Sequence, residues 1–469
     1  MNRLLLPRWR RPLLGAALAL ALAPAGAAGL WDLAAAARQH DPAAAVAQAT
    51  AAAGAARSDQ ARALWRPQVQ AQVSAGAMGA SSDVRGAAFS APGMAAPGGV
   101  AFSTQSDPGT GARWALTARW PLYSPQRSAQ ERQLDTAATL ADLQAASTRQ
   151  GLDLLVAQRY LDTVQAGQAL AVLQRQQQAT ERALQEAQDR FRLGDTPVTD
   201  VREAQARARA LAAQVLDAEL QHRQARQALA ASTGTDGSEP LDGPVPVEHL
   251  PALPPLAQWL EQVETRHPGL RQQQQAVALA RAQAAEVGRG SGVALDLVAQ
   301  ASREHLSGSG RYGAASASAS QQMLGLQLTV PLGTGGLRPA QERERLALVA
   351  QAEAEYQRQR QQVLLQARQG WQQLDAAAVR SAALQAAADA SRLRREATEL
   401  GRQVGDRTTL DVLLAQNDEA AAQLALQQWQ ARAALLRLKV LALGDALDDA
   451  ALRAATAPAA ALRSAGPAR

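Results

Sequence analysis

Two phrases of the sequence carry the same polar residues at the same spacing. Gly194–Gln205 reads GDTPVTDVREAQ, and Gly405–Gln416 reads GDRTTLDVLLAQ. In each phrase a second aspartate, Asp200 or Asp411, follows shortly after a Gly-Asp pair that interrupts a long helical pattern. A carboxylate in the first turn of a helix is stabilised by the unpaired N–H groups and by the helix dipole. The chemistry that these phrases predict is therefore electrostatic, and helix capping is its simplest form.

Side chains that catalyse reactions or bind metals form no such pattern. The sequence contains no cysteine and five histidines. The histidines show no metal-ligand spacing, and no glycine-rich phosphate loop or nucleophile motif is present. We therefore expect no enzyme activity, no metal and no cofactor. The five histidines are His40, His222, His249, His267 and His305.

The N-terminal segment predicts export. Residues 1–27 combine several arginines, a short apolar stretch at Leu13–Leu22 and an A-x-A site at Ala25–Ala27. This is the pattern of a secretory signal peptide, with an uncleaved anchor as the alternative. Most of the formal net charge of +6 lies in that segment. The remaining arginines form no clustered basic face, which argues against nucleic-acid binding.

The rest of the chain offers no transmembrane helix and no cysteine for lipidation. A helix that spans a bilayer needs about 18 or more consecutive apolar residues, and no such run follows the signal. If the mature chain crosses a membrane, it must therefore do so with β-strands.

Four segments alternate apolar and polar side chains with the period of a β-strand. They are 67–75, 113–120, 293–300 and 323–330, and the Gly/Ser/Ala-rich segments 76–110 and about 301–320 between them are expected to be loops. The alternation fits a transmembrane barrel. Trp114, Trp120 and Tyr123 suit an aromatic belt at the membrane interface. The alternative is a half-buried sheet in a soluble domain.

The order of elements repeats along the chain. We predict a signal peptide at 1–27, a first repeat at 28–231, a linker at 232–256, a second repeat at 257–447 and a disordered tail at 448–469. Each repeat reads helix, strand, strand, long helix, turn, helix. The segment Ser124–Arg192 would form a helix of roughly 100 Å, which must cross an aqueous space because the hydrocarbon core is only ~30 Å thick. Four strands cannot close a barrel, whereas several chains together could.

Taken together, these features resemble the TolC family of outer-membrane efflux and secretion channels. The resemblance covers nearly the whole mature chain and rests on the shared order of motifs in both halves. The most specific motifs are WPLY at 120–123, AQRYLDTV around Tyr160, FRLGDTPVTDV at 191–201 and VGDRTTLDVL at 404–413. The resemblance implies a mainly α protein with a transmembrane β-barrel, twelve-stranded in a trimer. Long helical hairpins would form a periplasmic tunnel, with the linker and the C-terminal region as a belt around it.

The same resemblance implies function and partners. The chain would be a passive exit duct in the outer membrane of a Gram-negative bacterium, for proteins or small toxic molecules. It would work as a homotrimer with a periplasmic adaptor (a membrane fusion protein) and an inner-membrane ABC or RND-type transporter. The un-lipidated form resembles the type I secretion branch more closely. The competing interpretation is a periplasmic coiled-coil adaptor or scaffold without a barrel.

The resemblance also implies a gate at the tips of the helical hairpins. Thr199 and Asp200 match the gate position of the first hairpin, and Arg407 matches an arginine that pairs with this aspartate across helices. Asp411 matches an acidic ring that constricts the pore. The sequence departs from the family pattern twice. Leu414 replaces a second acid, and Arg402 replaces a tyrosine and could add a cation for Asp200.

The two hairpin turns are implied as docking points for the adaptor. The residues that match these tip turns are Leu193, Gly194, Asp195, Val404, Gly405 and Asp406. For Asp200 and Asp411, helix capping and gating remain compatible interpretations.

Overall fold

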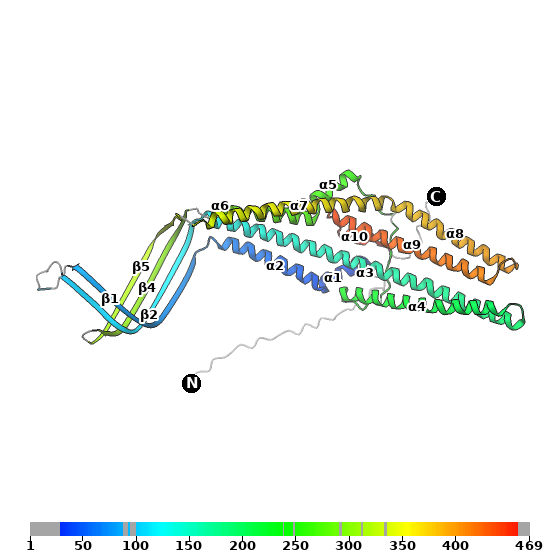
Figure 1. Cartoon of the computed structure of the whole chain (residues 1–469), viewed down its shortest axis with the longest axis horizontal. Helices are drawn as coiled ribbons and strands as arrows, with labels where there is room; N and C mark the ends of the chain where they lie inside the picture. The colour runs from blue at the N-terminus through cyan, green and yellow to red at the C-terminus, as the bar shows by residue number, and fades with distance from the viewer. Residues whose placement is uncertain are drawn as a thin grey trace, which may run out of the picture.

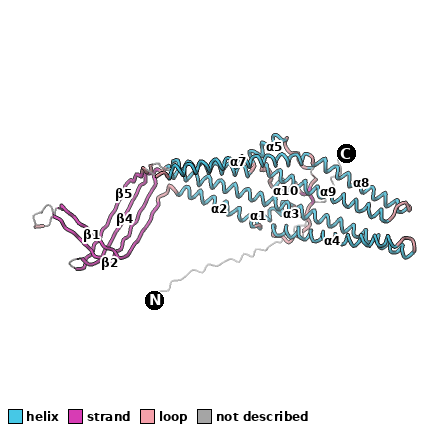
Figure 2. Tube along the Cα trace, viewed as in Figure 1, coloured by secondary structure: helices cyan, strands magenta, loops and turns pink. Residues whose placement is uncertain are grey.

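The computed structural model describes residues 29–87, 92–93, 100–237, 239–246, 249–289, 293–310, 313–332 and 335–457. The molecule is elongated, with a sheet at one end and a bundle of long helices extending from it (Figure 1). The four long strands lie at one end, apart from the long helices (Figure 2). The predicted signal peptide lies outside the described residues.

The first repeat follows the predicted order, except that two helices stand where one was expected before the strands. Its elements are α1 (Leu30–His40), α2 (Pro42–Ala63), β1 (Gln68–Ala87), β2 (Val100–Tyr123), α3 (Pro125–Leu193) and α4 (Val198–Thr233). The break between α1 and α2 falls at Asp41, whose carboxylate accepts the N–H of Ala43 at 2.8 Å. Pro42 then occupies the first helical position, where its missing N–H costs no hydrogen bond.

The second repeat follows the same order after a short strand, β3 (Gly243–Pro244). Its elements are α5 (Leu256–Arg266), α6 (Pro268–Arg289), β4 (Ala294–Gly310), β5 (Gly313–Thr329), α7 (Leu337–Asp375), α8 (Ala377–Gln403) and α9 (Thr409–Leu443). Pro268 opens α6 as Pro42 opens α2. The chain continues into α10 (Asp449–Ala454) and β6 (Thr456–Ala457). The repeated order of elements is therefore present in the fold.

The helices pack side by side along the whole molecule. Near the sheet, α3 contacts α2 and α6, and α6 contacts α7; towards the far end, α3 pairs with α4 and α8 with α9. Small residues allow close approach. A Cβ on Gly54 would lie 3.0 Å from the Cβ of Ala141 on α3. No helix in the described part of the chain is both long enough and apolar enough to span a bilayer.

The two repeats differ in their longest helix. In the first repeat α3 is continuous over 69 residues, about 100 Å at the helical rise. In the second repeat the corresponding path breaks at Ala376, between α7 and α8. There φ and ψ are −79° and −9°, away from the usual helical values of about −63° and −42°.

The four long strands form one antiparallel sheet in the order β1-β2-β4-β5. Trp114 of β2 stands opposite Val73 of β1 and Arg303 of β4.

The prediction of loops at 76–110 and 301–320 is wrong over most of their length. In the structure β1 and β2 extend over 20 and 24 residues, and β4 and β5 extend over 17 each. Gly, Ala and Ser lack an apolar alternation, but their backbones pair in a ladder like any others.

A buried cluster near the middle of the molecule joins both ends of the chain. Tyr160, Leu30 and Leu452 are each fully buried within it. We call β3, α10, β6 and the described linker segments 239–246 and 249–255 the belt.

The prediction of a disordered tail from residue 448 is wrong for 448–457, because Leu452 of α10 is buried and β6 pairs with β3. Residues 458–469 lie outside the described part.

Candidate functional site at the helical tips

The two hairpin turns have the same backbone geometry. Gly194 and Gly405 are left-handed, with φ of +85° and +86°. In each turn the glycine N–H donates to the carbonyl three residues back at 3.1 Å, and the next N–H, of Asp195 or Asp406, donates to the carbonyl five residues back at 2.9 Å. This is a Schellman motif, in which glycine ends a helix and satisfies its last carbonyls. The repeated Gly-Asp pair thus marks a structural repeat.

Each turn presents a large apolar side chain to solvent. Leu193 is 77% exposed, and Val404 is 75% exposed. The structure therefore places the six predicted tip residues at the two ends of the hairpins, with an apolar residue preceding the glycine in each.

Asp200 lies in the first turn of α4 and is bound by two neighbouring hydroxyls. Thr196 donates to one carboxylate oxygen at 3.0 Å, and Thr199 donates to the other at 3.3 Å. The negative charge of Asp200 therefore lies in the first turn of α4, held by hydroxyl groups, and no side chain caps the helix N–H groups there.

Asp411 occupies the same place in α9 and forms a capping box with Thr408. The N–H of Thr408 donates to the Asp411 carboxylate at 2.8 Å, and the N–H of Asp411 donates to the Thr408 hydroxyl at 3.1 Å. The hydroxyl of Thr408 also donates to this carboxylate at 2.9 Å. The N–H and hydroxyl bonds from Thr408, with a smaller contribution from the charge of Arg407, hold the pKa of Asp411 below its usual value. A lowered carboxyl pKa keeps this group ionised at neutral pH.

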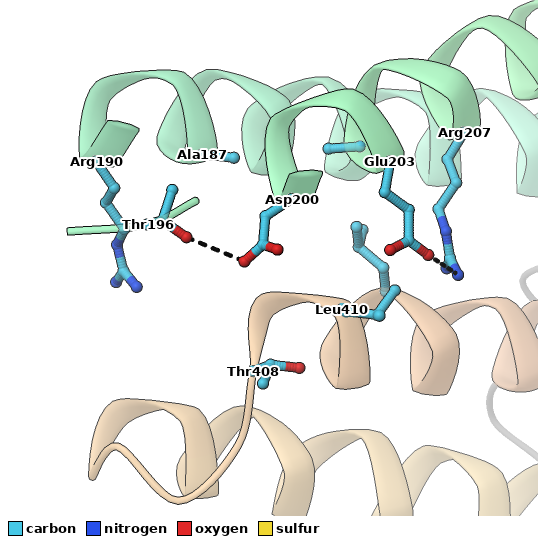
Figure 3. A pocket seen from close by; sticks show the side chains of 10 residues that line it. Ala187, Arg190, Thr196, Asp200, Glu203, Arg207, Thr408 and Leu410 are labelled. Carbon is cyan, nitrogen blue, oxygen red and sulfur yellow. Dashed lines mark hydrogen bonds and ion pairs between the residues drawn. The ribbon is translucent and has the colours of Figure 1, made fainter. Parts of the chain in front are cut away.

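A hollow of about 120 Å³ separates the first hairpin from the start of α9. In Figure 3, Asp200 and Glu203 of α4 lie on one side, and Thr408 and Leu410 lie on the other. Arg207 donates to Glu203 at 3.1 Å. All of the charged groups that line the hollow come from the first hairpin, whereas the second contributes two leucines and Thr408. Its lining is Ala187, Arg190, Thr196, Asp200, Glu203, Ala204, Arg207, Thr408, Leu410 and Leu413.

The two arginines expected beside Asp200 lie elsewhere within the single chain. No ion pair joins Asp200 to Arg407 or Arg402 among the residues that the structure describes. The side chain of Arg407 lies over Gly401, where a Cβ would come within 2.8 Å of its Cγ. Arg402 instead donates to Glu186 of α3 at 2.6 Å. The expectation that Arg402 adds a cation for Asp200 therefore does not hold within one chain.

Glu186 lies beside the predicted gate residues, and the sequence analysis did not single it out. The carboxylate of Glu186 pairs with Arg190 of the same helix at 2.9 Å and with Arg402 of α8. The second of these pairs links the end of α3 to the end of α8. The Glu186–Arg190 spacing of four residues, close to a predicted turn, was a visible signal of an ion pair. Its second partner could not be read from the sequence, because it comes from the other repeat.

The aromatic residues predicted for a membrane belt lie on β2, at its helix-proximal half. Trp114 and Trp120 are each 46% exposed, and Tyr123 is 56% exposed. The indole N–H of Trp120 donates to the carbonyl of Trp65 at 3.1 Å, which ties the strand to the end of α2.

No group of three or more acidic, histidine or cysteine side chains that could hold a metal occurs in the described ranges. One of the histidines that the sequence analysis examined caps a helix. Nδ1 of His267 accepts the N–H of Leu270 at 3.2 Å at the start of α6.

Comparisons with known proteins give a consistent family and fold. The family model described as outer membrane efflux protein matches residues 33–235 and 259–442. Outer membrane protein TolC of Vibrio cholerae is 36% identical over 109 residues, which are 23% of this chain and 25% of that relative's length.

Solved structures share the fold. The outer membrane protein VceC of Vibrio cholerae has a TM-score of 0.69 at 18% identity, over 89% of this chain and 97% of its own. The CmeC outer membrane channel of Campylobacter jejuni has a TM-score of 0.70 at 14% identity, over 99% and 97%.

Proposed function

Because the chain belongs to the outer membrane efflux protein family, we propose that it is a passive exit duct of the outer membrane, gated at its helical tips. The observation that carries this proposal is the division of the molecule into a sheet that no helix covers and a bundle of long helices (Figure 1). The longest of these, α3, has 69 residues and is about 100 Å long. The energy for export would come from an inner-membrane partner. The alternative of an adaptor without a barrel is not supported, since the family match covers both repeats.

The exposed sheet supports a barrel built from several copies. Leu324, Leu326 and Leu328 on one face of β5 are 75%, 65% and 62% exposed, and no layer of the described chain covers them. A continuous apolar face of this kind is stable when lipid covers it. The outer edges of β1 and β5 have no partner strand among the described residues, and open edges are not tolerated in lipid. A homotrimer with twelve strands would close these edges.

A gate at the tips would use charges from neighbouring copies. Three copies of Asp200 or Asp411 around a common axis repel one another, so a closed ring needs cations. Arg407 is exposed and forms no ion pair within the described chain, which leaves its guanidinium available to Asp200 of the next copy. Each exposed pair contributes only about 0–1 kcal/mol. Repeated three times, such pairs could bias two states that differ by a few kcal/mol.

The tips would also dock the periplasmic adaptor. The exposed Leu193 and Val404 stand on rigid Schellman turns, and a pair of apolar side chains on fixed backbones suits recognition by a partner helix. Through this adaptor the duct would connect to an ABC or RND-type transporter, and its cargo would be proteins or small toxic molecules selected upstream.

Conductance of the mature oligomer in a planar lipid bilayer tests the duct and the gate together. Stepwise insertion of discrete channels is expected, and Asp200→Asn combined with Arg407→Gln should raise the resting conductance several-fold. Arg192→Gln is the matched control, because it removes an exposed tip arginine that pairs with Asp189 of its own helix. A protein that never inserts contradicts the duct, and an unchanged resting conductance in the double variant contradicts this gate.

A further inference from the structure

A pocket in the belt contains an arginine without a counter-charge. The pocket has a volume of about 280 Å³ and lies between α9, α10 and the linker at Leu250 and Pro251. Apart from Arg437, all of its lining residues are alanine, leucine or proline. It is separate in the fold from the tips and from the four-stranded sheet, and the proposed gate does not use it.

Arg437 of α9 is half-buried. Its surroundings exclude water from the guanidinium and supply no negative charge to it. Burial lowers the pKa of its guanidinium, and no neighbouring acid acts in the opposite direction. No hydrogen bond or ion pair joins it to any residue in the described ranges. Other arginines of the region have partners: Arg38 binds two aspartates, and Arg453 stacks on the ring of Trp31 at 4.0 Å.

An unpaired charge in such a place carries a desolvation cost that an anion would offset. A guanidinium recognises a carboxylate with two parallel hydrogen bonds. The apolar pocket walls determine what the remainder of the ligand must be. A peptide segment would bring N–H and C=O groups into the pocket, and alanine and leucine side chains offer them no partners.

We propose that this pocket binds a small amphiphilic carboxylate, with its head group on Arg437 and its alkyl chain against the alanine and leucine walls. The volume lies just below the ~300–1,000 Å³ of typical small-molecule sites, which favours a single short chain over a polycyclic or two-chain molecule. Since the walls come from both α9 and α10, a bound molecule would hold the C-terminal helix onto the bundle.

Photoaffinity labelling of the mature oligomer tests this assignment. The probe is octanoate with a diazirine in its alkyl chain, and labelled peptides are identified by mass spectrometry. Label is expected in the segments Ala434–Leu441 and Ala446–Ala455. Excess octanoate should remove it, whereas excess 1-octanol should not, because the alcohol lacks the charge that Arg437 recognises.

Three variants sharpen the experiment. Arg437→Gln should reduce labelling at least tenfold, and Arg432→Gln, an exposed arginine on the same helix, should leave it unchanged. Ala454→Leu narrows the pocket from its exposed rim and should also reduce labelling while the guanidinium stays in place. Labelling that survives Arg437→Gln, or that octanol removes equally well, would show nonspecific apolar partitioning and overturn the proposal. Dissociation of the oligomer by Arg437→Gln would overturn it too, because the arginine would then pair with an acid of a second copy.

Discussion

The aspartates at the tips already have partners in their own turns, and this limits how a gate built on them can work. Asp200 accepts two threonine hydroxyls, and Asp411 accepts both the N–H and the hydroxyl of Thr408. These bonds fix where each carboxylate lies at the start of its helix. A neighbouring copy would therefore meet a positioned charge, and pairing would require little reordering of the aspartate.

The ion pair between Glu186 and Arg402 holds the two hairpins of one chain together near their tips, and this leads to a prediction. It joins the ends of α3 and α8, with 36% and 28% of the two side chains exposed. Glu186→Gln should change the free energy of unfolding by less than about 1 kcal/mol. The same variant should raise the resting conductance in bilayers, because α8 is released from α3.

A double variant tests whether these two residues act as a pair. Glu186→Gln with Arg402→Gln should raise the conductance no further than either change alone. Arg358→Gln is the control, since it breaks an exposed pair with Glu355 inside α7 and should leave conductance unaltered. Equal conductance in wild type and all variants would exclude a role for the link.

Among the elements, the hairpin turns make the sharpest prediction about stability. An L side chain in a left-handed position costs roughly 1–2 kcal/mol, so Gly405→Ala should destabilise the second tip by about that amount. Gly151→Ala is the matched control within α3, where a Cβ meets nothing within 4 Å and helix propensity favours alanine. Hydrogen exchange should show faster opening around residues 400–410 in the first variant only. Unchanged exchange there would contradict the turn assignment.

The sequence predicted helices well and strands only in part. The long helix expected at Ser124–Arg192 is present as α3, because an unbroken run of Ala, Gln, Arg and Leu has one strongly favoured backbone. The strands were recognised only where large apolar residues alternate. Their Gly, Ala and Ser continuations are held by pairing with neighbouring strands, and this information is absent from a single segment of sequence.

At the scale of the whole molecule, three side chains link α1 and α10, the first and last described helices, to α3 at the centre of the bundle. Arg38 of α1 donates to Asp153 of α3 at 2.8 Å and to Asp449 of α10 at 2.9 Å. The sequence could not predict this link, because its members lie in α1, α3 and α10, far apart along the chain. Nor could it predict an ordered α10, which depends on burial of Leu452 by both repeats.

This link predicts a pH dependence of stability. Hydrogen bonds from Arg38 hold the pKa of Asp449 below its usual value. The stabilisation is therefore present above the unfolded value of about 3.9 and is lost as the pH falls through the lowered folded value. The difference in melting temperature between wild type and Arg38→Gln should shrink as the pH is lowered from 7 to 3.

A control separates this effect from general acid denaturation. Arg392→Gln removes an exposed arginine that pairs with Asp389 within α8, and its melting temperature should follow that of the wild type at every pH. A difference between wild type and Arg38→Gln that stays constant down to pH 3 would show that Asp449 does not contribute.

The break at Ala376 makes the two hairpins mechanically unequal. The first hairpin is carried by α3, which is continuous over 69 residues. The second is carried by α7 and α8, whose backbone geometry changes at Ala376 although helical N–H to C=O bonds continue across it. From Ala376 to the tip, α8 is a lever arm of 27 residues, about 40 Å long. A bend of about 5° at Ala376 would move the tip end of α8 by roughly 3–4 Å, which is close to the distance between the charged atoms of an ion pair. Each copy would thus supply one hairpin on a continuous helix and one hairpin that can bend at Ala376. An opening built from three copies would widen as the three second hairpins tilt outward.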